Sequence, residues 1–369
     1  PTQYTVSDPD SLNVDQHRAI EKVMSAQDYA LVLGMPGTGK TTTIAHIIRA
    51  LTSQGKRVLL TSHTHTAVDN ILLKLKADKI PILRLGAPAK VHPDVQDFAI
   101  LAGQPMKSFE EIKHAWHGTP IVAKKCLGIN HPLFHERSFD YCIVDEASQI
   151  TLPICAGPIR MARTFVLVGD HNQLPPVVKN EEAREGGLDV SLFKLLSDTH
   201  PDSVVNLEHQ YRMCEDIMTL SNTLIYDVRL RCGTGQLRKR KLHVPRMDAL
   251  VQRHYDASTI HAATPRSFCS APGPNRCWLY DLLDSEARVR FVNTDTIQPA
   301  VREEAQGKRI ANSAEVRIVS QLVDSLLTVG VPDSEIGVMT HYRAQLFMLK
   351  DKLKVFSGVE MHTTDRFQG

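Results

Sequence analysis

Short apolar runs alternate with amphipathic segments through the first half of the chain. The runs are bounded by polar or turn residues and predict buried β-strands at residues 29–33, 58–61, 82–85, 121–123, 141–144 and 165–168. Between them, apolar residues at helical spacing predict helices at residues 14–25, 40–53, 67–75, 109–116 and 191–196. Alternating strands and helices with apolar strands are typical of a parallel sheet covered on both faces, so we predict an α/β fold.

The second half of the chain repeats this pattern only in part. Residues 215–224 and 312–327 predict helices, and residues 336–340, 343–353 and 359–362 predict a strand, a helix and a strand. We therefore expect two domains. The first spans residues 1–200 with a small helical insertion at 87–117, and the second spans 201–369 with an irregular insertion at 228–310. The basic run Arg238-Lys-Arg-Lys241 within that insertion is either a solvated loop or a phosphate contact.

Composition narrows the classes of protein. The 369 residues are 42% hydrophobic, enough for two cores. The net charge of +2 neither requires nor excludes nucleic acid, so any anion-binding surface is local. No stretch approaches a membrane span in length and apolarity, and we expect no membrane partner. Seven cysteines without a C-x-x-C pair indicate reduced thiols inside a cell, and the N-terminus, without signal-peptide features or an initiator Met, indicates a processed or excised piece.

The run Gly34-Met-Pro-Gly-Thr-Gly-Lys-Thr41 directly follows the first predicted strand and fits G-x-x-x-x-G-K-[ST]. Glycines let the backbone turn tightly with its N–H groups toward phosphate oxygens, and the following helix presents its positive end to them. We expect Lys40 to reach the β- and γ-phosphates and the Thr41 hydroxyl to hold Mg²⁺. The other expected nucleotide contacts in this loop are Gly34, Pro36, Gly37, Thr38, Gly39 and Thr42. The pattern predicts ATP and Mg²⁺ as cofactors, and the alternative is a glycine-rich turn before a helix.

Two adjacent carboxylates, Asp145 and Glu146, follow the strand predicted at residues 141–144. The carboxyl ends of parallel strands form the ligand crevice of such sheets. We expect Asp145 to bind Mg²⁺, through water, and Glu146 to accept a proton from an attacking water. The alternative is two solvated acids in a turn.

Three further motifs carry candidate chemistry. Gln173, in Gly169-Asp-His-Asn-Gln-Leu-Pro-Pro176, is expected to sense the γ-phosphate or position the attacking water, unless the segment is an ordinary proline-terminated loop. Arg212, at the expected start of the second domain, is either an arginine finger that stabilises transition-state charge or a surface arginine. Its neighbour Tyr211 is a candidate to stack on the base. Gln16 can bond the adenine edge through its amide, pair with Asn13 as a helix cap, or do both.

The order of these motifs resembles the superfamily 1 helicases of the 5′→3′ branch, which includes the RNA-decay and senataxin-type helicases. Within that branch, the likeness is closest to the helicase portion of the eukaryotic DNA-replication helicase/nucleases. It covers residues 12 to about 226 and 312–369 and is poor across 228–310. The runs that carry it are Gly34-Met-Pro-Gly-Thr-Gly-Lys-Thr41, Thr61-Ser-His-Thr-His-Thr-Ala-Val-Asp-Asn70, Lys90-Val-His-Pro93, Gly128-Ile-Asn-His-Pro132, Asp140-Tyr-Cys-Ile-Val-Asp-Glu-Ala-Ser-Gln149 and Gly169-Asp-His-Asn-Gln-Leu-Pro-Pro176.

The resemblance implies two RecA-like P-loop NTPase domains, the second incomplete at its C-terminus. It also implies ATP-dependent 5′→3′ movement on single-stranded DNA, with unwinding, in replication and repair. Thr64, Thr66 and Asn70 are then the expected strand contacts. Lys124 and Lys125 stand where the family tends to carry small hydroxyl residues, and they either add phosphate affinity or spoil a close contact. The implied partners are single-stranded DNA, a nuclease domain in the same full-length chain and a single-strand-binding protein, in the nucleus or alternatively the mitochondrion.

Two departures from the family pattern bear on activity. His341 stands where a proline is usual, and the sequence stops at Asp365-Arg-Phe-Gln-Gly369, before the family's last motif with its second arginine finger. We therefore expect weak or no motor activity from this chain alone. The alternatives are an RNA helicase of the same branch, since 2′-OH contacts are not displayed by sequence, or a nucleotide- and nucleic-acid-binding fragment without motor activity. A small-molecule kinase is disfavoured by the strand-contact motif.

Overall fold

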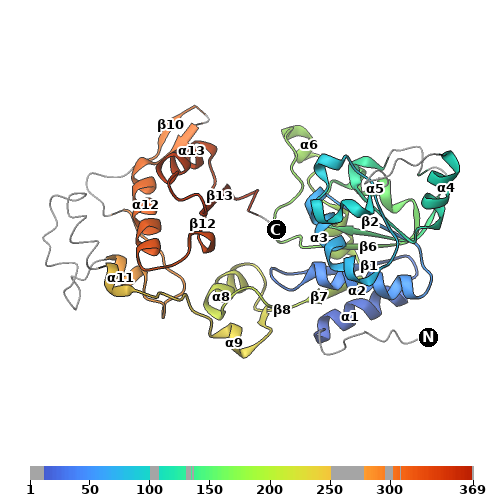
Figure 1. Cartoon of the computed structure of the whole chain (residues 1–369), viewed down its shortest axis with the longest axis horizontal. Helices are drawn as coiled ribbons and strands as arrows, with labels where there is room; N and C mark the ends of the chain where they lie inside the picture. The colour runs from blue at the N-terminus through green and yellow to red at the C-terminus, as the bar shows by residue number, and fades with distance from the viewer. Residues whose placement is uncertain are drawn as a thin grey trace, which may run out of the picture. The chain divides into compact units, whose positions relative to one another are not determined.

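The computed structural model describes residues 12–99, 108–129, 134, 137–250, 278–295, 302–307 and 309–367. The chain divides into two compact units, Pro1–Arg238 and Lys239–Gly369. The first is drawn in blue to yellow in Figure 1, ending with α9 (Gly235–Arg238), and the second runs from there to red.

A parallel sheet forms the centre of the first unit. Its seven strands lie in the order β3-β4-β2-β5-β6-β1-β7, and every neighbouring pair is parallel. Their bounds are β1 (Tyr29–Gly34), β2 (Val58–Ser62), β3 (Ile82–Arg84), β4 (Ile121–Lys125), β5 (Phe139–Asp145), β6 (Ala162–Gly169) and β7 (Val204–Leu207). The α/β prediction is confirmed, and each of the six strands predicted in the first half is found with small differences at its ends.

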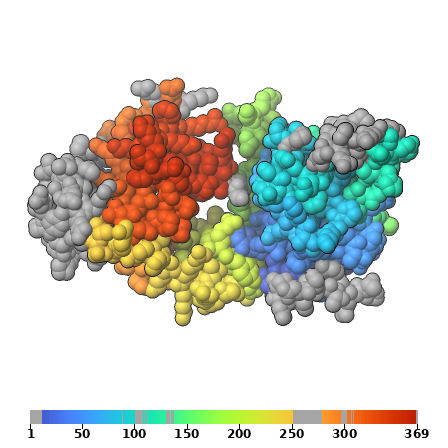
Figure 2. Space-filling model, in the orientation of Figure 1, coloured from blue at the N-terminus to red at the C-terminus, as the bar shows by residue number. Residues whose placement is uncertain are grey.

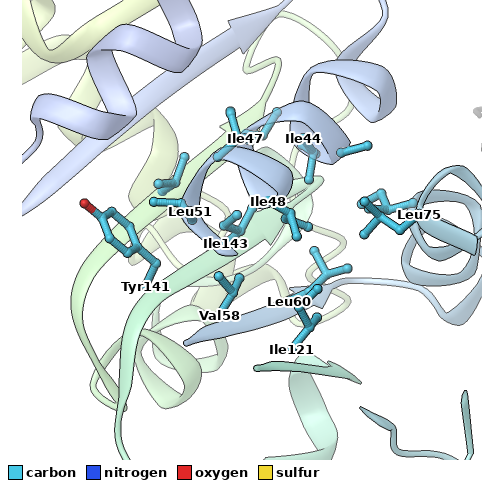
Figure 3. Close-up of a cluster of buried hydrophobic side chains, with 14 of the residues drawn as sticks. Ile44, Ile47, Ile48, Leu51, Val58, Leu60, Leu75, Ile121, Tyr141 and Ile143 are labelled. Carbon is cyan, nitrogen blue, oxygen red and sulfur yellow. The ribbon is translucent and has the colours of Figure 1, made fainter. Parts of the chain in front are cut away.

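Helices cover both faces of this sheet. On one face lie α1 (Val14–Ser25), α2 (Lys40–Ser53) and α3 (His65–Leu75). The buried side chains of α2 repeat at intervals of three and four residues, and Figure 3 shows them against β2 and β5: Ile44, Ile47, Ile48 and Leu51. Each fully buried side chain of this kind contributes about 1.5–3 kcal/mol. Packing on this face fixes α2 against the sheet, and the loop between β1 and α2 is thereby held at both ends.

The opposite face is covered by α4 (Phe109–Gly118), α5 (Leu152–Ile159), α7 (Leu192–Thr199) and α8 (Glu215–Leu224). Helix α5 was not predicted, because Pro153 at its first turn and Pro158 inside it interrupt the helical pattern. The short helix α6 (Glu181–Glu185) projects from the body of the first unit (Figure 1 and Figure 2).

The first unit extends further along the chain than the predicted domain boundary. Strand β7 pairs with β1 from Leu31↔Val204 to Gly34↔Leu207, so the segment after residue 200 completes the first sheet. Met218 of α8 and Tyr226 belong to the apolar core on the second face. The expected start of the second domain at residue 201 therefore lies inside the first compact unit, which runs to Arg238. The short strands β8 (His209–Gln210) and β9 (Arg231–Cys232) and helix α9 (Gly235–Arg238) complete it.

The second unit contains the predicted helix, strand, helix and strand. These are α12 (Ser313–Thr328), β12 (Gly337–Thr340), α13 (Arg343–Lys352) and β13 (Glu360–Thr363), with β12 and β13 parallel. Helix α11 (Trp278–Leu282) packs into the same core, and β10 (Glu304–Gln306) and β11 (Arg309–Ala311) form an antiparallel pair. The insertion predicted at 228–310 contains only short elements in its described part, and residues 251–277 lie outside the described residues.

Two predictions from composition can be compared with the described residues. None of their helices has the length and apolarity needed to cross a membrane. Five cysteines are free thiols there, namely Cys126, Cys142, Cys155, Cys214 and Cys232, while Cys269 and Cys277 lie outside the described part of the chain.

Candidate nucleotide-binding site

The carboxyl ends of five strands of the first sheet meet at one edge. Leu33 of β1 is level with Gly169 of β6, and Ser62 of β2 is level with both Lys125 of β4 and Asp145 of β5. The phosphate loop, the Thr61–Asn70 motif, the Asp145–Glu146 pair and the turn with Gln173 each lie at the end of one of these strands. The parallel register therefore brings together residues that are more than 100 positions apart in the sequence.

The loop between β1 and α2 has the backbone that its glycines allow. Gly37 (φ 74°) and Gly39 (φ 80°) adopt left-handed conformations. A Cβ atom on Gly34 would lie 2.1 Å from Cγ of Lys40, so only glycine leaves room for the lysine stem. Lys40 Nζ donates to the carbonyl oxygen of Gly34 at 2.9 Å, and the Thr38 hydroxyl donates to the carbonyl oxygen of Met35 at 2.7 Å. These hydrogen bonds within the loop hold the Lys40 side chain over it, and α2 begins at Lys40.

Asp145 and Glu146 end strand β5 in different environments. Asp145 is buried, and its Oδ1 has no hydrogen-bond partner among the described residues. Burial and the neighbouring Glu146 raise the pKa of the Asp145 carboxyl, while Lys40 opposes this shift. A buried carboxylate oxygen without a partner among the described residues, near the charge of Lys40, fits a hard divalent cation such as Mg²⁺. Glu146 is half-buried and its carboxylate accepts from Gln149 Nε2 at 3.2 Å.

The backbone at Glu146 is in the left-handed region, with φ of 53°. For a residue other than glycine this costs on the order of 1–3 kcal/mol, and it persists only where the surroundings enforce it. The turn it makes directs the chain into the 3₁₀ turn at Ala147–Gln149. Glu146 is thereby half-buried, whereas its neighbour Asp145 is buried.

Gln173 is held by the turn after β6. Its Nε2 donates to Asp170 Oδ2 at 2.7 Å, and the backbone N–H of Asp170 donates to the Ser148 hydroxyl at 3.1 Å. A Cβ on Gly169 would lie 2.9 Å from the Ser148 nitrogen, so glycine permits the close approach of these two turns. The turn carrying Gln173 is therefore fixed to the turn that follows Glu146.

Gln16 lies against the same loop from α1. Its side-chain oxygen accepts the N–H of Asn13 at 3.1 Å while Asn13 accepts the N–H of Gln16 at 2.9 Å, which is a complete capping box. Its Nε2 is on the loop side, 3.0 Å from the position of a Cβ on Gly39. The capping interpretation is confirmed, and the adenine contact stays a prediction for the amide nitrogen.

Tyr211 and Arg212 also lie beside the loop, within the first unit. The N–H of Tyr211 donates to the carbonyl oxygen of Gly37 at 2.8 Å, and Asn13 Nδ2 donates to the Tyr211 hydroxyl at 2.9 Å. A Cβ on Gly37 would lie 2.7 Å from Cβ of Arg212. Arg212 was expected to reach the site from a second domain. In the structure it belongs to the unit that carries the loop, because the segment after β7 packs onto that unit.

The candidate strand contacts surround the ends of β2 and β4. Thr64, Thr66 and Asn70 are exposed at the start of α3. Thr64 caps this helix by accepting the N–H of Ala67 at 3.2 Å, so the helix begins at His65, two residues before the predicted start at residue 67.

The two lysines that end β4 are half-buried. Lys124 Nζ lies 5.6 Å from the centre of the Phe134 ring. Burial, and secondarily Arg84, lower the pKa of Lys124. Lys125 lies level with Ser62, near the motif that continues to Asn70.

An ion pair beneath this motif was not predicted. Arg84 Nε donates to Asp69 Oδ1 at 2.7 Å, with both side chains almost fully buried. Arg84 also donates to the Leu85 carbonyl oxygen at 2.7 Å and contacts His65 Nδ1 at 3.0 Å. Since a guanidinium can only donate, His65 Nδ1 accepts and the ring is neutral. Burial and Arg84 accordingly lower the pKa of His65.

The chain matches two family models, each described as an AAA domain, at residues 11–108 and 103–181 for one and 188–369 for the other. The chain resembles helicases over nearly its whole length. It is 47% identical over 99% of its length to the DNA replication ATP-dependent helicase/nuclease DNA2 of Saccharomyces cerevisiae, covering 23% of that protein. It is 44% identical to the protein of that name in Schizosaccharomyces pombe and 42% in Homo sapiens, over 97% of this chain and 24% and 33% of those proteins.

The chain thus spans between about a quarter and a third of the length of the curated relatives it matches. The matched domains imply ATP binding, and the resemblance seen in the motifs is confirmed. A solved structure of Bacteroides Pif1 bound to ssDNA matches 60% of the chain at 18% identity and a TM-score of 0.33, which is too low to bear on function.

Two positioning side chains near this site were missed by sequence reasoning. Gln210 is fully buried, and its Oε1 accepts the N–H groups of Arg212 and Met213 at 2.9 and 2.8 Å. Asp15 Oδ2 accepts the N–H of Glu208 at 3.0 Å and of His209 at 3.1 Å. Both build the turn that presents Tyr211 and Arg212. In the sequence, Gln210 stands out only as the first residue of the run Gln210-Tyr-Arg-Met213, and Asp15 gives no local signal.

Proposed function

We propose that this chain is the motor portion of an ATP-dependent DNA helicase that moves 5′→3′ on single-stranded DNA, within a longer helicase/nuclease. The observation that supports it most is the pairing at the end of β5. A buried carboxylate oxygen of Asp145 without a partner among the described residues lies near Lys40, and the next residue, the proton acceptor Glu146, has a left-handed backbone. This is the arrangement needed to hold a metal-bound triphosphate and to activate water beside it.

Each side chain has a role in the proposed reaction. Lys40 exchanges its contact with the Gly34 carbonyl for the β- and γ-phosphate oxygens, and Thr41 and Asp145 hold Mg²⁺. When bound, Mg²⁺ neutralises charge on the phosphate oxygens. Glu146 accepts the proton of the attacking water.

Four side chains complete the proposed site. Gln173 orients that water or senses the γ-phosphate. Arg212 stabilises the charge that develops on the transferred group. Gln16 and Tyr211 bind the base, one through its amide nitrogen and the other by stacking.

Strand binding belongs to the surface around α3. Thr64, Thr66 and Asn70 contact phosphate and sugar, and Lys124 and Lys125 add positive charge at the end of β4. The relatives are named as DNA replication enzymes, which favours single-stranded DNA over RNA and action in the nucleus. A nuclease domain in the same full-length chain and a single-strand-binding protein are the proposed partners.

The test compares Lys40→Ala and Glu146→Gln in the full-length protein. Strand-stimulated ATPase falls by at least about a hundredfold in each, since each variant removes a charge that acts in the transition state, while strand binding is retained. Glu182→Gln on the exposed helix α6 is the matched control and keeps its activity. Undiminished turnover in Glu146→Gln would exclude it as the base.

Two further measurements separate the alternatives. Stronger ATPase stimulation by RNA than by single-stranded DNA would favour the RNA helicase. Vigorous ATPase from residues 1–369 alone would exclude the fragment without motor activity.

A further inference from the structure

Tyr226 reaches the turn that carries Gln173 from a distant part of the chain. Its hydroxyl donates to Asp170 Oδ2 at 2.8 Å across 56 positions of sequence. The same carboxylate oxygen accepts Gln173 Nε2 at 2.7 Å. The other oxygen accepts the N–H of Asn172 at 3.0 Å. Tyr226 and Asp170 are both almost fully buried, so these contacts are shielded from water.

The donor and acceptor roles in this cluster are fixed by chemistry. An ionised carboxylate only accepts, so Tyr226 must donate, and the nitrogen end of the Gln173 amide must face Asp170. Burial, and then Asp170, raise the pKa of Tyr226, so the hydroxyl keeps its proton. Gln173 also hydrogen-bonds the Tyr226 side chain. The direction of the Gln173 amide oxygen is therefore set by two buried neighbours.

The segment that carries Tyr226 is itself held firmly. Tyr226 follows α8 and its ring lies in the apolar core that contains Met218. Asn222 exchanges hydrogen bonds with the backbone of Leu230, donating at 3.0 Å and accepting at 2.9 Å, which closes the loop around Tyr226. Asp227 and Val228, directly after it, both have positive φ angles of 49° and 59°. Left-handed backbone at two successive residues with side chains persists only where the surroundings enforce it.

We propose that Tyr226 is a positioning residue for Gln173: through Asp170 it fixes the Gln173 amide in the orientation used for ATP hydrolysis. This inference rests on the proposed function, in which Gln173 acts on the γ-phosphate or the attacking water. Tyr226 also links Gln173 to Arg212, because the chain runs from Arg212 through α8 to Tyr226. A movement of that segment thereby reaches Gln173 through a single hydroxyl.

The test removes that hydroxyl with Tyr226→Phe in the full-length protein. We expect kcat of the strand-stimulated ATPase to fall roughly tenfold with KM for ATP nearly unchanged, because orientation at the reacting group is lost and phosphate binding is not. Tyr141→Phe, at another buried tyrosine of the first unit, is the matched control and keeps kcat within about twofold. Asp170→Asn turns one acceptor into a donor facing the Gln173 amide, and the same loss of kcat is expected.

A double-mutant cycle distinguishes positioning from a general structural role. In a Gln173→Ala background, Tyr226→Phe has no further effect on kcat, because there is no amide left to orient. An equal loss in both backgrounds overturns the inference, and so does unchanged kcat in Tyr226→Phe when Gln173→Ala is impaired. Unchanged kcat in Gln173→Ala instead contradicts the role of Gln173 in the proposed function, and the inference falls with it.

Discussion

Replacing Arg84 by Met tests how the strand-contact motif is anchored. The Arg84 side chain is 0% exposed and that of Asp69 is 3% exposed, and their closest atoms are 2.7 Å apart. Removing the guanidinium leaves the Asp69 carboxylate buried with only the N–H of His92 at 2.9 Å. Leaving a buried charge without its partner costs about 3–5 kcal/mol. For a unit of this size that lowers Tm by about 6–20 °C.

The assay is thermal unfolding followed by circular dichroism, with two controls. Arg184→Met breaks an exposed pair with Glu181, whose side chains are 54% and 78% exposed, and costs no more than about 1 kcal/mol. Arg84→Met combined with Asp69→Leu removes both charges. This double variant loses less free energy of unfolding than Arg84→Met alone, because no unpaired carboxylate remains. A cost below about 1 kcal/mol for Arg84→Met, or additive losses in the double variant, would refute the assignment of this pair as an anchor.

Two further predictions concern the loop and the pH dependence. Gly34→Ala puts a methyl group 2.1 Å from Cγ of Lys40, so nucleotide affinity measured by fluorescence titration falls at least about tenfold. Gly118→Ala, with nothing within 4 Å, binds normally. His65 has a lowered pKa, so the folded chain binds fewer protons than the unfolded chain below pH 6.5, and stability is lost as the pH falls below that value. The drop in Tm between pH 7.5 and 5.5 is smaller in His65→Gln, and an equal drop would contradict this account.

Much of the site was predictable because its signals are local. The phosphate loop needs glycines at fixed spacing before a lysine, and that pattern is complete within eight residues. The helices at Val14–Ser25 and Glu215–Leu224 were predicted with their observed bounds because apolar spacing is a local signal, and the first also has a cap residue at Asn13. Their position at the end of an apolar strand was enough to place Asp145 and Glu146 at the edge of the sheet where the carboxyl ends of the strands meet.

The sequence alone therefore determined the kinds of element, the loop and the residue types at the end of each strand. Tertiary structure decided that β7 extends the first sheet, that Arg212 lies in the same unit as the loop, and that Tyr226 reaches Gln173 through Asp170. It also decided which buried charges pair, as in Arg84 with Asp69. Local patterns depend on neighbours along the chain, whereas these contacts depend on the register and packing of segments that are distant in sequence.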